Sequence, residues 1–314
     1  MQLKISNLSK TYPNGVKALK NLSLDISTGL FGLLGPNGAG KSSLMRTIAT
    51  LQEADEGSVF LDELDVLKDK DSVRRILGYL PQEFGVYPKM SALDLLDHVA
   101  VMKGVTNRGE RKDLVEGLLR QTNLHDVRKK KLGGYSGGMK QRFGIAMALI
   151  GDPKLIIVDE PTAGLDPTER NRFLNLLGSI GENVIVILST HIVEDVRELC
   201  ARMAIIHKGE VLAEGNPQSA IDAINGKVWK KVIAKEEIEG YLSSHKTLST
   251  HLIAGKTEIR VFSEDRPDAS FQPVEPDLED VYFLQINHGG HGGHGGHGGH
   301  GGHGGHGGQN GTGN

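Results

Sequence analysis

A short glycine-rich stretch is the part of this sequence whose residue types most directly indicate chemistry. Gly35 and Gly40 enclose four residues and are followed at once by Lys41 and Ser42. Glycines let the backbone curl so that successive N–H groups point at an anion, and a helix starting near Lys41 adds its positive end. At this spacing the lysine would reach the β- and γ-phosphates of a nucleotide, and the serine would ligate Mg²⁺. The predicted phosphate-binding set is Gly35, Pro36, Asn37, Gly38, Ala39, Gly40, Lys41, Ser42 and Ser43.

Two consecutive carboxylates form a second chemical feature. Asp159 and Glu160 follow the apolar run 155–158, which predicts a buried strand that delivers both acids at its end. Asp159 would hold Mg²⁺, directly or through water, and Glu160 would polarise the attacking water as general base. A strand ending in two solvated acids is the alternative, but it is less expected downstream of a phosphate loop. Together the two features predict a P-loop nucleoside triphosphatase that uses ATP and Mg²⁺.

A third stretch narrows the family. Ser136, Gly137 and Gly138 precede a helical pattern, and this Ser-Gly-Gly core resembles the ABC ATPase signature Leu-Ser-Gly-Gly-Gln. Tyr135 and Met139 depart from the usual Leu and Gln. A serine hydroxyl and bare glycine N–H groups before a helix bind anions well. In the family, the signature of one subunit completes the site built on the P-loop of the other. The resemblance therefore implies a second ATP-binding subunit, most simply as a homodimer.

Four further residues match positions of the same family in the same order. Gln82 resembles the Q-loop glutamine that contacts Mg²⁺ and water, and Asp166 resembles the D-loop aspartate at the dimer interface. His191 resembles the switch histidine that contacts the γ-phosphate, and Tyr12 resembles the aromatic that stacks on adenine. Taken singly, each also has a plainer interpretation as a loop amide, a cap or a strand residue. The implied catalytic residues are Glu160, His191, Gln82 and Lys41. The implied Mg²⁺ ligands are Ser42, Gln82 and Asp159.

Hydrophobic patterns predict the elements that must position these residues. Alternation at Leu3, Ile5 and Leu8 predicts an N-terminal strand, and the run 30–34 predicts a buried strand before the glycine loop. After the loop, Leu44, Ile48 and Leu51 have helical spacing. Residues 91–149 are mostly helical in pattern. Further strands are predicted at 155–158, 184–188 and 203–206. These patterns predict an α/β fold with a parallel sheet and a helical insertion. The resemblance implies the fold class more closely: α/β, a RecA-like P-loop NTPase core with an N-terminal antiparallel β subdomain and an inserted α-helical subdomain.

Three segments are expected along the 314 residues. Residues 1–215 form the ATP-binding domain, with the helical subdomain at about 86–150, and residues 216–287 form a small α+β accessory domain. Residues 288–314 begin with seven His-Gly-Gly repeats, which we expect to be disordered because such glycine density cannot offset chain entropy. The repeat histidines suit Zn²⁺, Ni²⁺ or Cu²⁺; a flexible or added appendage is the interpretation we favour.

Composition limits the remaining possibilities. The formal net charge is -3 with mixed signs, so no general nucleic-acid footprint is expected. The single cysteine, Cys200, excludes an intramolecular disulfide and is interpreted as a small core residue. No apolar run is long enough to span a bilayer, and we expect no leader peptide. The resemblance to ABC ATPases implies a cytoplasmic location, at the inner face of the cell membrane, through a separate permease.

The kind of ABC protein is suggested by two regions. Residues 276–283 resemble the ending common among ATPase subunits of ABC-2 type exporters, which implies an exporter subunit with an integral-membrane permease as partner. In the family, the region of Phe84, Val86, Tyr87 and Pro88 receives the permease; local core packing is the alternative. A soluble ABC ATPase acting on the ribosome or DNA is the other class considered, but the chain has neither a second motif set nor a long coiled coil. A GTPase is excluded because no Asn-Lys-x-Asp motif is present.

Overall fold

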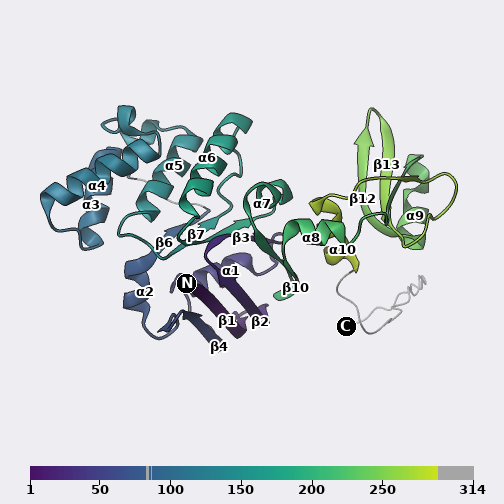
Figure 1. Cartoon of the computed structure of the whole chain (residues 1–314), viewed down its shortest axis with the longest axis horizontal. Coiled ribbons are helices and arrows are strands. Elements are labelled where there is room, and N and C mark those ends of the chain that lie inside the picture. The colour runs from purple at the N-terminus through teal and green to yellow at the C-terminus, as the bar shows by residue number, and fades with distance from the viewer. Residues whose placement is uncertain (83–84, 86, 289–314) are drawn as a thin grey trace, which may run out of the picture.

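The computed structural model describes residues 1–82, 85 and 87–288. The predictions for Phe84, Val86 and the glycine-histidine tail from residue 289 onward lie outside the described residues. The structure has three sheets: the helices of residues 92–121 lie at one end of the longest axis, the sheet that contains residues 246–262 lies at the other end, and the other two sheets lie one beside the other between them (Figure 1). Within the described residues, no helix has the length and apolar character needed to cross a membrane.

A six-stranded sheet forms the centre of the molecule and carries the phosphate loop. Its core strands are largely apolar and mostly buried on both faces, as parallel strands under helices must be. Only its edge pair β10–β9 is antiparallel. The order is β10 (Glu210–Gly215), β9 (Arg202–His207), β3 (Gly29–Leu34), β8 (Ile185–Thr190), β7 (Leu155–Asp159) and β6 (Leu77–Leu80). The three strands predicted at 155–158, 184–188 and 203–206 are thus present.

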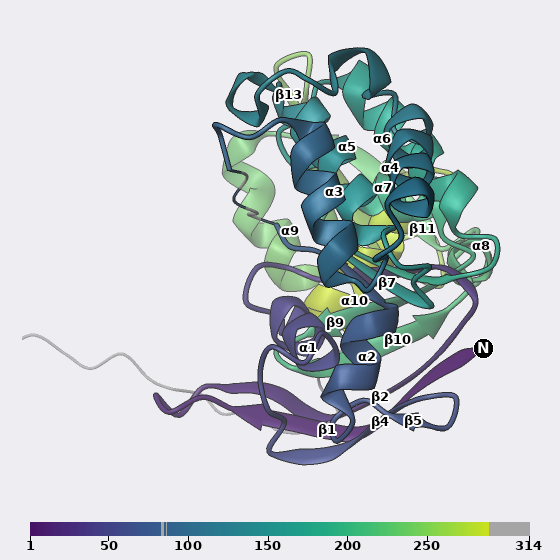
Figure 2. The same cartoon turned by 90° about the vertical axis from the view of Figure 1, so that its left-hand side faces the viewer.

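A four-stranded antiparallel sheet packs against one face of the central sheet, as Figure 2 shows at its lower edge. Leu3 and Ile5 point into the shared core, and a register shift before Leu8 keeps that side chain inside as well. Asn7 adopts a positive φ of 50° at this irregularity. The order is β2 (Lys17–Ser27), β1 (Gln2–Thr11), β4 (Glu56–Leu61) and β5 (Leu64–Asp65).

The helix after the phosphate loop is shorter than its apolar spacing predicts. α1 spans Lys41–Ile48, and Leu44 and Ile48 are buried as expected. The inclusion of Leu51 in the buried face is wrong, because its side chain is 62% exposed. Thr50 turns into the left-handed region at φ 61°, which ends the helix, and Arg74 Nε donates to Thr50 Oγ1 at 2.9 Å and holds that turn.

A helical segment lies between β6 and β7 and has its own apolar cluster. Ser91 and Asn107 cap its first two helices by accepting backbone N–H bonds, as their residue types favour. Its helices are α3 (Ala92–Met102), α4 (Arg108–Gln121), η1 (His125–Val127), η2 (Leu132–Gly134) and α5 (Gly137–Ala148). The remaining helices of the central region are α2 (Lys70–Ile76), α6 (Pro167–Ile180) and α7 (Val193–Leu199).

The last part of the described chain forms a third sheet joined to the centre by helices. Leu278, Val281 and Tyr282 of the final helix share one apolar cluster with Val196 and Cys200. The prediction that Cys200 is a core residue is confirmed, and burial raises the pKa of its thiol to about 12. The sheet order is β12 (Lys246–Ile253), β13 (Lys256–Phe262), β11 (Val228–Ile233) and β14 (Gln272–Pro273). Its helices are α8 (Pro217–Asp222), η3 (Lys235–Glu237), α9 (Ile238–Ser244) and α10 (Leu278–His288).

Candidate active site

The glycine loop between β3 and α1 is closely packed against neighbouring backbone. A Cβ on Gly35 would lie 2.3 Å from the Ile206 carbonyl oxygen, and one on Gly40 would lie 2.5 Å from that of Ala18. Gly40 also has a φ of 111°, which side-chain-bearing residues rarely adopt. These two positions therefore require glycine for space, and Gly40 for conformation as well. The loop leads directly into the N-terminus of α1, where backbone N–H groups are free to bind an anion.

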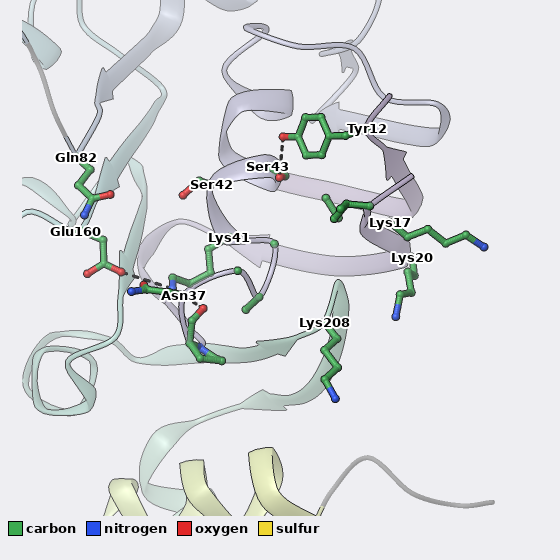
Figure 3. Close-up of a pocket in the computed structure, with 16 residues that line it drawn as sticks. Tyr12, Lys17, Lys20, Asn37, Lys41, Ser42, Ser43, Gln82, Glu160 and Lys208 are labelled. Carbon is green, nitrogen blue, oxygen red and sulfur yellow. Dashed lines mark hydrogen bonds and ion pairs between the residues drawn. The ribbon is translucent and has the colours of Figure 1, made fainter. Parts of the chain in front are cut away.

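Lys41 lies inside the curve of the loop. Its ammonium donates to the carbonyls of Gly35 at 2.6 Å and Pro36 at 3.3 Å, and it lies 3.5 Å from Glu160 Oε1 (Figure 3). The side chain is buried, so this charge is stabilised by nearby oxygens rather than by bulk water. A phosphate in the loop would offer the ammonium a stronger, anionic acceptor than the two carbonyls.

Glu160 follows β7 in an unusual backbone conformation. Its φ is 49°, and its N–H donates to the Ser189 carbonyl at 2.9 Å, which ties it to the neighbouring strand β8. Non-glycine residues in this region cost on the order of 1–3 kcal/mol and concentrate at active sites. The turn brings its carboxylate toward Lys41, while His191 Nδ1 lies 2.5 Å from Glu160 Oε2. One buried carboxylate thus contacts a lysine from the loop and a histidine from the end of β8.

Asp159 has the chemistry of a site for a hard cation. Burial raises the pKa of its carboxyl; the Ser189 hydroxyl opposes this rise, the Glu160 carboxylate adds to it, and the Ser42 hydroxyl also lowers the pKa. Among the described residues, Asp159 Oδ1 and Ser189 Oγ are both buried, and neither atom makes a hydrogen bond of ordinary geometry, although the two side chains are close enough to interact. A buried carboxylate oxygen beside a serine hydroxyl fits Mg²⁺, which binds oxygen ligands.

A cavity of about 520 Å³ opens over the loop. This volume is within the usual range for small-molecule sites. Tyr12 stands at its rim, where its hydroxyl lies 3.0 Å from Ser43 Oγ and donates to Gln52 Oε1 at 3.1 Å. Gln82 is exposed and reaches the cavity from the opposite side (Figure 3). The lining includes every residue of the predicted phosphate-binding set except Gly35, whose carbonyl contacts Lys41.

Three lysines that the sequence analysis did not identify also line this cavity. Lys17 and Lys20 come from β2, and Lys208 comes from the turn between β9 and β10 (Figure 3). Lys20 pairs with Glu210 at 3.3 Å. Among the described residues of the lining, four are lysines and one, Glu160, is an acid, so this part of the cavity favours a polyanion. The lysines at 17 and 20 follow Tyr12 closely in sequence, but nothing in their spacing indicates that Lys208 joins them.

The signature and D-loop residues lie elsewhere. Ser136 caps α5 by accepting the Met139 N–H at 3.2 Å, and Asp166 caps α6 by accepting the Glu169 N–H at 3.0 Å. Neither these residues nor Gly137 and Gly138 are among those that line the cavity. Within the described part of one chain, the fold brings together Tyr12, Lys41, Glu160 and the other P-loop-side residues, and leaves the Ser-Gly-Gly turn on a separate surface.

Fold and site together define a nucleotide-binding P-loop protein of the ATP-binding-cassette type. The family described as ABC transporter matches residues 19–163. The chain is 35% identical to the ABC transporter ATP-binding protein YxlF of Bacillus subtilis (strain 168), over 76% of this chain and 79% of that protein. It is 38% identical to NatA of the same organism, over 66% of this chain and 85% of NatA. The chain therefore belongs to the ABC transporter ATP-binding proteins.

Two further relatives agree with this assignment. The linearmycin resistance ATP-binding protein LnrL of Bacillus subtilis (strain 168) is 34% identical, with 79% of each chain covered. Among solved structures, the dimeric post-hydrolysis state of the ATP-binding cassette MJ0796 bound to ADP and Pi superimposes with a TM-score of 0.62 at 30% identity, covering 68% of this chain and 98% of that one. The fold class expected from the sequence is thereby confirmed.

Proposed function

We propose that this protein is the ATP-hydrolysing subunit of an exporter, and that two copies close around two MgATP molecules. The observation that carries the proposal is the separation within one chain: the P-loop, Glu160 and Tyr12 line one cavity, and Ser136 does not. A second copy offers the missing surface, since the signature helix start is suited to the far side of a γ-phosphate. The dimeric structure of the cassette MJ0796 supports this arrangement.

Each residue of the cavity has a proposed task. Tyr12 stacks on the base, the loop N–H groups and Lys41 bind the β- and γ-phosphates, and Glu160 orients the attacking water and accepts its proton. His191, which contacts Glu160, keeps that carboxylate in a fixed position relative to the γ-phosphate. Ser42, Asp159 and Gln82 would hold Mg²⁺, which when bound neutralises charge on the phosphate oxygens.

The work of transport follows from differential binding. ATP contacts both subunits of the closed pair, so its γ-phosphate favours closure, and hydrolysis removes that link. We propose that the opening and closing move a membrane permease bound to this protein at the cytoplasmic face of the membrane. The role of LnrL as a linearmycin resistance protein, together with the resemblance of residues 276–283 to exporter endings, supports outward transport.

A complementation assay tests whether the pocket is shared. Lys41→Ala removes the phosphate lysine, and Ser136→Arg blocks the signature, so each variant alone should be inactive. Mixed, they form some pairs in which one intact P-loop faces one intact signature, and ATPase activity should return to a fraction of the wild-type rate. Activity that stays absent on mixing, while both variants remain folded, would contradict the shared pocket.

Glu160→Gln tests the proposed base separately. This variant should bind ATP and accumulate as a closed dimer in size-exclusion chromatography, because the γ-phosphate is no longer removed. Normal turnover by this variant would exclude Glu160 as base. For the permease, full-length protein purified from detergent-solubilised membranes should carry a multi-span membrane protein; recovery with ribosomes or DNA would favour a non-transport ABC ATPase.

A further inference from the structure

A fully buried acid on α7 connects three segments that carry proposed active-site residues. Asp195 has no exposed surface. Its Oδ2 accepts the Thr162 hydroxyl at 2.5 Å, and its Oδ1 accepts Arg170 Nε at 2.7 Å. Arg170 Nη2 lies 2.6 Å from the same Oδ1, an ion pair at an angle unsuited to a second hydrogen bond. We call Asp195, Thr162 and Arg170 the Asp195 cluster.

Each member of the Asp195 cluster belongs to a different active-site segment. Thr162 lies two residues after Glu160, in the turn that follows β7. Asp195 lies four residues after His191, on the first turn of α7. Arg170 lies on α6, whose cap is Asp166. The Asp195 cluster therefore connects the loop that follows the proposed base Glu160, the helix that follows the switch histidine His191 and the helix that follows the D-loop.

The placement of the Asp195 cluster limits what it can do. None of its members lines the nucleotide cavity, so none contacts the phosphates there. Glu160 and His191, by contrast, must meet across 2.5 Å although they follow different strands, and Glu160 does so in a left-handed conformation. Contacts that fix the segments carrying Glu160 and His191 are the kind of support that holds Glu160 in its left-handed conformation.

The charges around Asp195 are consistent with a permanent contact. Arg170 faces it from α6, and Glu198, one turn along α7, lies 3.8 Å from Arg170 Nη2. A buried ion pair that loses one partner leaves an uncompensated charge, so the pair resists separation. The Thr162 hydroxyl donates a hydrogen bond to the second oxygen of the Asp195 carboxylate. Removal of this hydroxyl would leave that buried carboxylate oxygen with one hydrogen bond fewer.

We propose that Asp195 is a positioning residue for hydrolysis: it holds the Glu160 loop against α7 so that Glu160 and His191 meet in the geometry that water attack requires. This inference rests on the proposed roles of Glu160 and His191. It assigns to Thr162 and Arg170 the task of transmitting that constraint. The cluster acts on turnover and leaves nucleotide affinity to the P-loop.

The test compares Thr162→Val, which loses the hydroxyl, with Thr162→Ser, which keeps it. Thr162→Val should lower kcat roughly 10- to 100-fold, the range expected when supporting residues misplace catalytic groups, with KM for ATP unchanged. Thr162→Ser should turn over at nearly the wild-type rate. Equal loss in both variants, or a Thr162→Val rate within about twofold of wild type, would overturn the proposal.

A double-mutant cycle separates positioning from a purely structural role. His191→Ala already breaks the contact with Glu160, so adding Thr162→Val should lower kcat little further. If the two substitutions instead lowered kcat by independent factors that multiply, Thr162 would act by a route that does not involve the contact between His191 and Glu160. If Thr162→Val unfolds, Arg170→Lys replaces it in the same cycle, because lysine keeps the positive charge but lacks the planar pair of N–H donors of the guanidinium group.

The proposed function and the role of the Asp195 cluster are refuted by different results. Full turnover by Glu160→Gln would remove the base on which the inference rests. An inactive Glu160→Gln together with a normal Thr162→Val would refute only the role of the Asp195 cluster.

Discussion

The lysines around the nucleotide cavity differ in how tightly they are held. Lys41 is buried and fixed by loop carbonyls, whereas Lys20 shares its charge with Glu210 at the surface. Lys17 and Lys208 reach the rim from two elements that are distant in sequence. Exposed charges attract a ligand through solvent, and salt weakens this attraction. The rim lysines therefore contribute to nucleotide binding more than to hydrolysis.

Replacing Lys17 and Lys208 together by alanine should weaken ATP binding roughly three- to tenfold at low salt and leave kcat unchanged. The difference from wild type should shrink as ionic strength rises. Lys112→Ala, on the exposed face of α4, is the matched control and should alter neither quantity. Nucleotide titrations at two salt concentrations measure the effect, and a loss that persists at high salt would contradict solvent-screened attraction.

At the same scale, sequence reasoning identified residues whose chemistry is local. Gly35, Gly40 and Lys41 form a pattern within a few positions, and Asp159 with Glu160 directly follows a buried strand. Lys208 and Asp195 could not be found in this way, because their neighbours lie far along the chain. The Asp195–Thr162 bond joins residues 33 positions apart, and no local spacing indicates it.

Among the elements, the turn between β9 and β10 supports the phosphate loop from below. The Gly209 N–H donates to the Ala39 carbonyl at 2.8 Å, and the Gly209 carbonyl accepts the Lys20 N–H at 2.9 Å. A Cβ on Gly209 would lie 2.8 Å from the Ala18 carbonyl oxygen. The loop is thus held by β2 on one side and by the β9–β10 turn on the other, which explains why Gly40 has so little space.

Gly35→Ala should abolish most nucleotide binding while α/β secondary structure remains, because its Cβ would push the loop away from the Ile206 carbonyl. Gly117→Ala is a matched control on the exposed surface of α4, where nothing lies within 4 Å of the new Cβ. The control should bind ATP normally and gain about 0.5–1 kcal/mol in unfolding free energy. Calorimetric titration and chemical denaturation measure both variants; normal ATP binding by Gly35→Ala would show that the loop yields.

Element types could be predicted better than element ends. Apolar runs on β3, β7 and β8 marked buried strands because parallel strands have no polar face. β6 and β12 escaped prediction, since short or mixed strands resemble loops until their partners are known. The end of α1 was misjudged because Thr50, which ends it, is fixed by Arg74 from another helix.

For the whole molecule, α10 is the link between the third sheet and the nucleotide-binding core. Its apolar side chains pack beside α7, while its Asp280 pairs with Arg260 of β13 at 2.7 Å. Arg260 also contacts Asp277 at 2.9 Å, just before the helix. Burial raises the pKa of Asp280 to about 6, with the charge of Arg260 acting in the opposite direction.

The stability of the protein should therefore depend on Asp280 between about pH 4 and pH 6. The folded-state pKa exceeds the ordinary value of 3.8, so the folded chain binds more protons there and the contribution of this group falls as pH rises through that window. Asp280→Asn should flatten this part of the profile of unfolding free energy. Asp113→Asn, on the exposed surface of α4, is the control; an identical slope in both variants would contradict the assignment.

The support of the phosphate loop by the β9–β10 turn also bears on the order of events during synthesis. Lys20 and Glu210, which pair beside the loop, are 190 positions apart. At about 5–20 residues per second, a ribosome needs roughly 10–40 s to make the stretch between them. A nascent chain therefore carries the glycine loop long before it has the hairpin that supports it, so ATP can meet the fully supported loop only late in synthesis.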